Sequence, residues 1–377
     1  MLTIDEFRAL DAAGPLELGQ NQAEYLLGFS LLAPSSHNTV PLAYRIDVAR
    51  ARIELWLRRS FVLPASDPTG KEALISTGCA LENLSLAAAQ YGMAGRWHVD
   101  SQLSWELISK AQSAALRVGH LQLDCASVPN AQARRAALEC MVQRRTVRAE
   151  FDPTQRIPPA LRDDLERAAS ESIDVRLSIF ESAADKFAWG KLDELATKHK
   201  LEERAFRHEL GRWMLPNDDE RSTRGMRGRE FGLEDRLSRD LPAQLRDEQP
   251  IAADQLTFMS RAGRIGLCSS SAVCVLSGRS SSVAGTIDVG RAFQRCWLHA
   301  TLYGFCAAVH TAICHVPHVR AMSSATLMKS SQPDVIFRLG KPLQASDAQR
   351  AHSSRPRLQD LLLDEVLSAE SSRPVRV

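Results

Sequence analysis

Apolar positions along the chain recur with two spacings, one typical of helices and the other typical of strands. Helical spacing predicts helices at about residues 3–13, 21–32, 71–91, 159–169, 183–214 and 287–303. Short or alternating apolar runs predict strands at about residues 44–48, 53–57, 175–180, 272–276 and 335–339. The first two strands flank a short polar turn, which predicts a hairpin. Helices and strands together predict an α+β fold.

Two stretches lack such a pattern. Residues 113–135 are irregular and contain Pro129, so we place an internal boundary there, between an N-terminal half (1–130) and a C-terminal half (131–377). Residues 216–250 are dense in Arg, Asp and Glu with scattered glycines. This composition predicts that the segment lies on the protein surface, and the length of the segment makes it a candidate lid.

The chain also carries an internal similarity. Residues 76–92 align without a gap with residues 288–304, and six of the 17 positions are identical, including Gly78 with Gly290. Helices rich in Ala and Leu that end in glycine can align by chance, but the equal spacing favours a duplication. A duplicated unit of this size is expected to fold as a pseudo-dimer within one chain.

Charge and length narrow the class of protein. The 377 residues include 47 Lys and Arg against 45 Asp and Glu, so the net charge of +2 indicates neither a nucleic-acid nor a membrane-surface partner. The length predicts two domains or one large one. The first residues are acidic where a signal peptide is basic, and the longest apolar stretch falls short of the ~20 residues of a spanning helix. We expect a soluble, cytoplasmic protein.

The eight cysteines show neither a C-x-x-C pair nor the paired spacing of a zinc site. Several of them, such as Cys79 and Cys296, fall in apolar helical runs, where a thiol is usually a small buried hydrophobe. We therefore predict no metal site.

Three segments resemble the FMN-dependent nitroreductase family: residues 33–38 (APSSHN), 76–84 (STGCALENL) and 144–151 (RRTVRAEF). The last is similar to the family's R-R-[ST]-x-R-x-F signature, with one extra residue before the Phe. Ordinary members carry this signature ahead of the A-P-S-x-x-N segment. The reversed order here resembles the tandem, single-chain branch called Acg-type, over about residues 23–362.

The resemblance implies two nitroreductase-like halves, each a mixed or antiparallel sheet flanked by helices, that form an intramolecular pseudo-dimer with FMN at their interface. It implies an oxidoreductase that passes electrons from NAD(P)H through FMN to a small organic acceptor, such as a quinone, a nitroaromatic or a biosynthetic intermediate. The expected assembly is a monomer built as a pseudo-dimer, or a homodimer. Because hydride chemistry belongs to the cofactor, no catalytic side chain is expected.

The basic segment 144–148 is the predicted site of the FMN phosphate. A buried phosphate dianion requires cations and hydrogen-bond donors, and Arg144, Thr146 and Arg148 supply two guanidinium groups and a hydroxyl on alternate positions. The family pattern implies that Arg355 and Arg357 complete this cradle. The alternative is a solvated basic face that follows a helix.

The other expected flavin contacts come from two further segments. The resemblance implies that a loop of Pro34, Ser35, Ser36 and Asn38 contacts the ring edge or the ribityl chain, although these residues could also form an N-cap cluster. It also places backbone amides of residues 305–311, with Ala308 among them, near the flavin N5. The family often continues N-x-Q-P-W after the loop asparagine, whereas residues 38–42 here read NTVPL.

A second function also fits the sequence. A closed lid over residues 216–250 would make the chain a flavin-sequestering or storage protein with little NAD(P)H turnover. A dedicated biosynthetic flavoenzyme is a third possibility, and the sequence does not separate it from the first.

Overall fold

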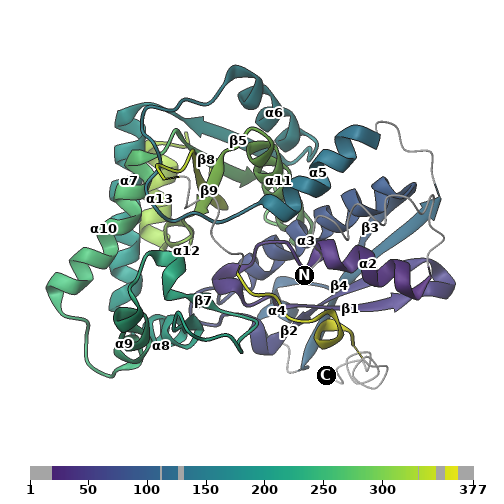
Figure 1. Ribbon diagram of the computed structural model, residues 1–377, viewed down its shortest axis with the longest axis horizontal. Coiled ribbons are helices and arrows are strands. Elements are labelled where there is room, and N and C mark those ends of the chain that lie inside the picture. Colours follow the sequence, from purple (N-terminus) through teal and green to yellow (C-terminus); the bar gives the residue numbers. More distant parts are fainter. Residues whose placement is uncertain (1–18, 111–112, 126–130, 330, 345–352, 364–377) are drawn as a thin grey trace. The chain divides into compact units, whose positions relative to one another are not determined.

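The structure is a computed structural model that describes residues 19–110, 113–125, 131–329, 331–344 and 353–363 (Figure 1). The helix predicted at residues 3–13 lies outside the described residues. The chain divides into two compact units. Unit 1 comprises residues 1–143, 282–294 and 355–377, and unit 2 comprises residues 144–281 and 295–354.

Unit 1 is built on a four-stranded sheet in the order β1-β2-β4-β3, in which each strand is antiparallel to its neighbours. Its strands are β1 (Leu42–Asp47), β2 (Arg52–Arg58), β3 (Met93–Val99) and β4 (Ala115–Cys125). Its helices are α2 (Gln20–Ser30), α3 (Lys71–Gln90), α4 (Trp105–Lys110) and α5 (Ala131–Gln143). The predicted hairpin is confirmed as the β1–β2 pair, which closes at Asp47 and Arg52.

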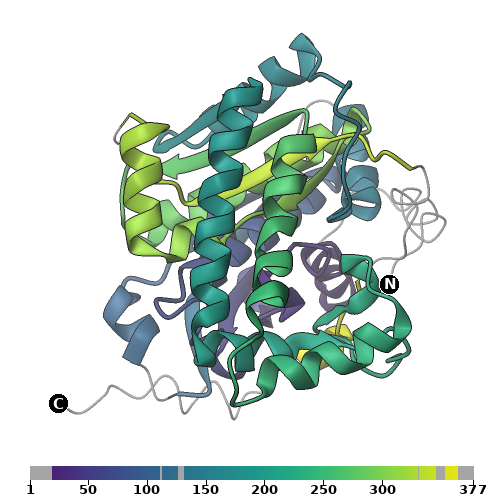
Figure 2. The ribbon, with the colours of Figure 1, turned by 90° about the vertical axis from the view of Figure 1, so that its left-hand side faces the viewer.

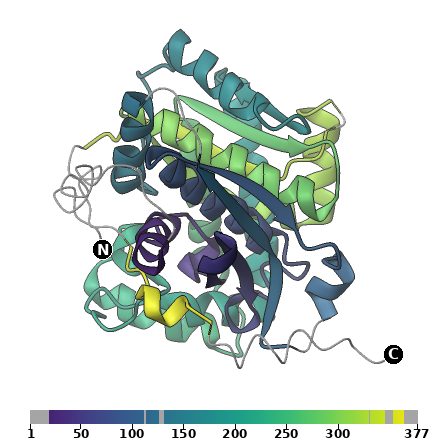
Figure 3. The same ribbon diagram turned by 90° about the vertical axis from the view of Figure 1, so that its right-hand side faces the viewer.

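The two faces of the unit 1 sheet, whose ribbon is drawn in Figure 3, differ in the polarity of their side chains. Side chains alternate between faces along a strand, so Ile53, Leu55 and Leu57 of β2 share one face and are fully or almost fully buried. The alternate positions place Arg52 and Glu54 on the other face. The long helix α3 packs against α2, α5 and β3 and forms the centre of the apolar layer of unit 1.

Unit 2 is built on a second antiparallel sheet, in the order β5-β8-β10-β9. Its strands are β5 (Val175–Phe180), β8 (Ala272–Gly278), β9 (Cys306–Val309) and β10 (Val335–Gly340). Its helices include α6 (Pro159–Ser170), α7 (Ala183–Glu202), α8 (Arg204–Trp213), α9 (Asp235–Arg246), α10 (Ala253–Ser269), α12 (Ala312–His315) and α13 (Pro317–Thr326). A short parallel pair joins β6 (Met214–Leu215) to β7 (Met226–Arg227).

Helices α7 and α10 lie side by side across one face of this second sheet (Figure 2). Trp189 of α7 and Leu267 of α10 pack with Val273, Val275 and Ile336 of the strands, and all five side chains are fully buried. This core therefore fixes the positions of the two internal strands, β8 and β10, relative to the two helices.

The structure supports the predicted duplication. Both sheets pair their first, second, third and fourth strands in the order first-second-fourth-third. In both, a 20-residue helix joins the second strand to the third: α3 in unit 1, and α11 (Val283–Leu302), whose first part belongs to unit 1 and whose last part belongs to unit 2. Each helix is followed by a glycine with left-handed φ, Gly92 at 74° and Gly304 at 73°.

Within unit 1, α3 and the first part of α11 cross at the two aligned glycines. A Cβ atom on Gly78 would lie 2.0 Å from the carbonyl oxygen of Ile287, and one on Gly290 would lie 2.1 Å from that of Ile75. Ile75 and Ile287 are the residues immediately before the two aligned segments. The contact is therefore reciprocal, as expected when two copies of one helix pack about a local twofold axis.

Several expectations are corrected. Residues 113–135 are not irregular throughout, because β4 is an 11-residue strand, and its pairing with the chain-distant β2 and β3 is a tertiary interaction. The predicted helix 183–214 is interrupted at Glu203, where ψ is 115°, and forms α7 and α8. Residues 216–250 contain the helix α9, whose Leu241 and Leu245 are buried in a small core.

The fold class is α+β, with two antiparallel sheets flanked by helices, as predicted. Among the helices of the described residues, none combines the length and the apolar character that a membrane span needs.

Candidate functional site

The predicted phosphate-binding segment lies beside β9 in unit 2. Thr146 forms a parallel β-bridge with Ala307, and the N–H of Val147 donates to the Ala307 carbonyl at 3.0 Å. Further along, Phe151 forms an antiparallel bridge with Pro342. The backbone is thus anchored at both ends of the basic stretch.

Arg144 is buried at the start of this segment, and its guanidinium lies 4.3 Å from the centroid of the Trp297 ring. An aromatic face attracts a cation and shields it from water. The alternative of a solvated basic face is therefore wrong for Arg144.

Arg148 and Thr146 retain hydrogen-bonding capacity. The Arg148 side chain is 31% exposed, and its guanidinium lies 4.2 Å from the Phe231 ring centroid. Its Nη2 donates to Met226 Sδ at 3.6 Å, and its ion pair with Glu230 is long, at 3.8 Å. Desolvation lowers the pKa of Arg148, and the Glu230 carboxylate opposes that shift. Among the described residues, no partner is recorded for the Thr146 hydroxyl. These donors fit an oxyanion such as a phosphate monoester.

The residues that contact the Arg148 side chain belong to the candidate lid. Glu230 accepts from the N–H of Arg227 at 3.1 Å and from the Ser353 hydroxyl at 2.9 Å, which ties the lid to a distant part of unit 2. Sequence reasoning missed Glu230 and Phe231. Their signal was weak: one acidic and one aromatic side chain in a polar, glycine-containing stretch.

The loop of residues 35–40 in unit 1 is strained. His37, Asn38 and Val40 all have left-handed φ values, between 45° and 53°. Such values are uncommon for residues other than glycine and rare for a β-branched side chain. The Ser35 hydroxyl accepts from the N–H of Val40 at 3.0 Å and helps to hold this conformation. Strained backbone of this kind concentrates at functional sites.

Two predicted site residues that are far apart in sequence meet at this loop. Arg355 donates from Nη1 to Asn38 Oδ1 at 2.6 Å and from Nε to the Leu31 carbonyl at 2.8 Å. Ser36 donates to the buried carboxylate of Glu72. These contacts order the loop, and Ser35, at the N-cap position of the short helix η2 (Ser36–Asn38), makes no capping hydrogen bond with its side chain.

The remaining predicted residues are placed as follows. Pro34 is partly buried, Arg357 is exposed, and Ala308 is buried in β9 opposite Arg338 of β10. Thr146 thus pairs with β9, the strand of unit 2 that contains Ala308, whereas Asn38 and Arg355 belong to unit 1. The joint use of both sets by one cofactor stays a prediction.

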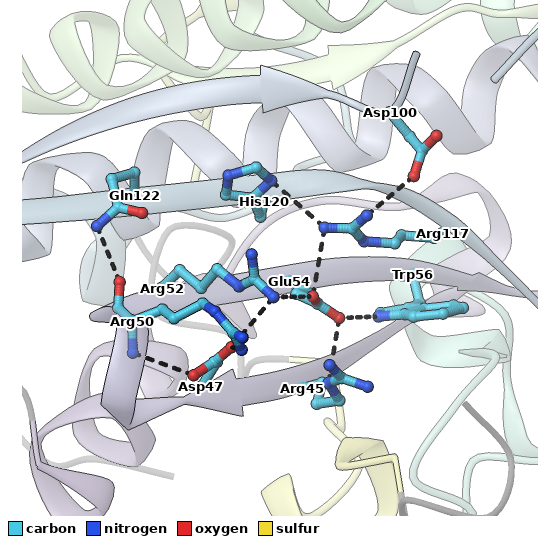
Figure 4. Close-up of polar contacts among 10 residues, drawn as sticks. All are labelled: Arg45, Asp47, Arg50, Arg52, Glu54, Trp56, Asp100, Arg117, His120 and Gln122. Carbon is cyan, nitrogen blue, oxygen red and sulfur yellow. Dashed lines mark hydrogen bonds and ion pairs between the residues drawn. The ribbon is translucent and has the colours of Figure 1, made fainter. Parts of the chain in front are cut away.

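A second charged cluster covers the polar face of the unit 1 sheet (Figure 4). Three arginines converge on the buried Glu54 carboxylate: Arg45 at 3.2 Å, Arg117 at 3.3 Å and Arg52 at 3.4 Å. Trp56 adds a hydrogen bond from Nε1 at 3.3 Å. The arginines are 21–34% exposed, so water solvates their outer sides.

This cluster is best explained as part of the structure of the sheet. Arg52 also pairs with Asp47 at 3.1 Å and Arg117 with Asp100 at 3.1 Å, so charges of opposite sign alternate across the strands. Cross-strand pairs of opposite charge stabilise antiparallel sheets. With three carboxylates within reach, the arginines need no ligand.

Comparisons with known proteins give a partial match. No protein-family model matches the chain. Two proteins from strains of Mycobacterium tuberculosis, each described as a "Putative NAD(P)H nitroreductase", are 33% identical over 89 residues, which is 22% of this chain and 25% of theirs. The chain thus matches about a quarter of the length of these relatives.

Solved structures of similar fold are more distant. A "putative nitroreductase" from Anabaena variabilis has a TM-score of 0.46 and 11% identity, covering 87% of this chain and 90% of that one. An FMN-dependent nitroreductase from Mycobacterium smegmatis, in complex with NADPH, has a TM-score of 0.38 and 17% identity, covering 61% and 97%. Both TM-scores are below 0.5, and neither likeness adds to the case for a function.

The Glu54 cluster gives a stability prediction. Glu54→Gln keeps the side-chain shape but removes the charge that three arginines share, so we expect the free energy of unfolding to fall by about 2 kcal/mol. The matched control is Asp124→Asn, which breaks the exposed pair with Arg96 and should change it by less than about 1 kcal/mol. Urea denaturation measures both. Equal effects of the two variants would contradict the central role of Glu54.

Proposed function

We propose that this chain is an FMN-dependent oxidoreductase of nitroreductase type, which passes electrons from NAD(P)H to a small organic acceptor. The observation that carries the proposal is the basic segment at β9. There the Thr146 hydroxyl and the weakly paired Arg148 guanidinium can donate to an anion, beside the buried Arg144. The partial match to proteins described as NAD(P)H nitroreductases supports the same reading, as does the resemblance of residues 33–38 and 144–151.

The residues present fit the phosphate end of FMN. Arg148 would pair with a phosphate oxygen and Thr146 would donate from its hydroxyl, while Arg144 adds positive charge from beneath the Trp297 ring. Bound FMN supplies hydride and single-electron chemistry, which leaves orientation and electrostatics to the protein. The predicted flavin contacts of Pro34, Ser35, Ser36, Asn38 and Ala308, and the phosphate contacts of Arg355 and Arg357, remain part of the proposal.

A second function is favoured by a specific contact. Glu230 and Phe231 of the candidate lid both lie on Arg148, so the lid residues compete for the guanidinium that an anion would use. A lid that stays closed would make the chain a flavin-sequestering protein with little turnover. Deleting residues 216–250 is a poor test because Leu241 and Leu245 belong to a core with Leu201 and Met214. A single substitution of Phe231, which contacts Arg148, tests the lid without disturbing this core.

Replacement of Arg148 tests the phosphate site. Arg148→Ala should weaken FMN binding about 10- to 100-fold, because it removes a charge-assisted hydrogen bond from the phosphate. Fluorescence titration of the flavin-free protein with FMN measures the change. Arg176→Ala, at an exposed position of β5, is the matched control and should leave the affinity unchanged. FMN affinity that is the same in both variants and the parent would refute the assigned site.

Replacement of Phe231 separates the two functions. Under the oxidoreductase proposal, the parent protein oxidises NADPH with a suitable acceptor, and Phe231→Ala changes the rate by less than about threefold, a shift below 1 kcal/mol. A storage protein would show negligible turnover in the parent and a rise of tenfold or more in the variant. Phe258→Ala, which truncates an exposed aromatic residue of α10, controls for surface effects.

A further inference from the structure

Arg338 is a charged residue in the core of unit 2. It lies in the internal strand β10, is only 1% exposed, and is opposite Val273 of β8 and Ala308 of β9. Its neighbour on the same face, Ile336, packs into the core beneath α7 and α10. A buried arginine is costly unless its charge and its donors are satisfied. Its contacts therefore indicate why it is there.

The guanidinium of Arg338 holds the backbone of the basic segment. Its Nη2 donates to three consecutive carbonyl oxygens: Val147 at 3.3 Å, Arg148 at 2.8 Å and Ala149 at 2.9 Å. The guanidinium carbon also lies 4.2 Å from the Phe151 ring centroid.

Helix α10 leaves room for this side chain. A Cβ atom on Gly266 would lie only 3.0 Å from the guanidinium carbon of Arg338, so a larger residue there would crowd it. The Arg338 side chain extends from β10 and is thus enclosed by α10 and the basic segment.

These contacts orient the amide groups of the segment. The described residues include no cis peptide bond, and in a trans peptide the N–H points opposite to the C=O. The N–H groups of Arg148, Ala149 and Glu150 therefore point away from Arg338. Within the part of the chain that the structure describes, no acceptor is recorded for these three N–H groups. These N–H groups are therefore available to donate to an anion on the outward side of the segment.

Charge adds to the geometry. Burial lowers the pKa of Arg338 to about 10, and the Asp193 carboxylate of α7 opposes that shift, so Arg338 remains a cation at neutral pH. Asp193 is in turn hydrogen-bonded to His310 at 3.2 Å. The cation of Arg338 thus lies behind the peptide groups whose N–H ends face outward, and it polarises them toward an anion.

We propose that Arg338 is a positioning residue that turns the amides of Arg148, Ala149 and Glu150 into an oxyanion site, whose ligand is a phosphate monoester dianion. Thr146 and the Arg148 side chain complete its donors. The inference rests on the proposed function, in which that ligand is the FMN phosphate. It differs from the sequence prediction because backbone amides, organised from behind by an arginine outside the motif, bind the anion together with the motif side chains.

The test compares FMN with riboflavin, which lacks the phosphate, on the full-length protein. Arg338→Met replaces the guanidinium by an apolar chain of similar length and should weaken FMN binding about 30-fold, the effect of losing charge-assisted hydrogen bonds. Riboflavin affinity should change by less than twofold. Arg338→Lys retains the charge and three donors and should restore most of the FMN affinity. Equal losses for both flavins would show a merely structural role and overturn the inference.

Hydrogen exchange supplies a readout without flavin. In the flavin-free protein, Arg338→Met should speed exchange of the hydrogen-bonded amides of Val147 and Phe151 at least tenfold, whereas Arg338→Lys should change it little. Unchanged exchange in Arg338→Met refutes the positioning role. If Arg338→Met does not fold, Phe151→Leu, which removes the ring beneath the guanidinium, is expected to give a smaller loss confined to FMN. If the parent protein does not bind FMN, the proposed function is wrong. The hydrogen-exchange result still decides whether Arg338 positions the segment.

Discussion

The buried charge of Arg338 is the constraint on which the candidate site depends. Of a guanidinium that is 1% exposed, Nη2 finds acceptors in the carbonyls of residues 147–149, whereas Nε and Nη1 are buried with no hydrogen-bond partner among the described residues. Arg338 therefore holds the basic segment in place. The carbonyl oxygens of residues 147–149 accept from Arg338, and the N–H groups of residues 148–150 point away from it. The buried side chain of Arg338 also explains why Gly266 lies so close to its guanidinium. The Asp193 carboxylate partly offsets its charge.

The helices α3 and α11 impose a second constraint. At their crossing, Gly78 and Gly290 each approach a carbonyl of the other helix so closely that no side chain fits. The further course of α11 carries Trp297, which covers Arg144. Helix α11 thus carries both Gly290, which packs against its counterpart Gly78 at the crossing, and Trp297, which belongs to the candidate site. Both sheets keep the same strand order, although their sequences have diverged.

Local sequence patterns predicted much of this fold, since the β1–β2 hairpin, the helices α3 and α11, and the strands β5 and β10 depend on near-neighbour spacing and terminal glycines. The pattern failed at β4, which long-range pairing stabilises, and at Glu203, where a continuous helical pattern is broken. For the candidate site, the spacing of Arg144, Thr146 and Arg148 predicted the segment, and its role in binding stays a prediction. Phe231, Glu230 and Arg338 could not be found, because their roles arise only when distant elements pack together.

The most direct test of the account is a crystal structure of the protein grown with FMN. The account predicts phosphate oxygens at about 2.7–3.2 Å from the Thr146 hydroxyl and from the N–H of Ala149, with the Arg148 guanidinium alongside. Arg338 would remain beneath, bonded to the three carbonyls. A phosphate bound elsewhere, with the amides of residues 148–150 facing only solvent, would contradict it.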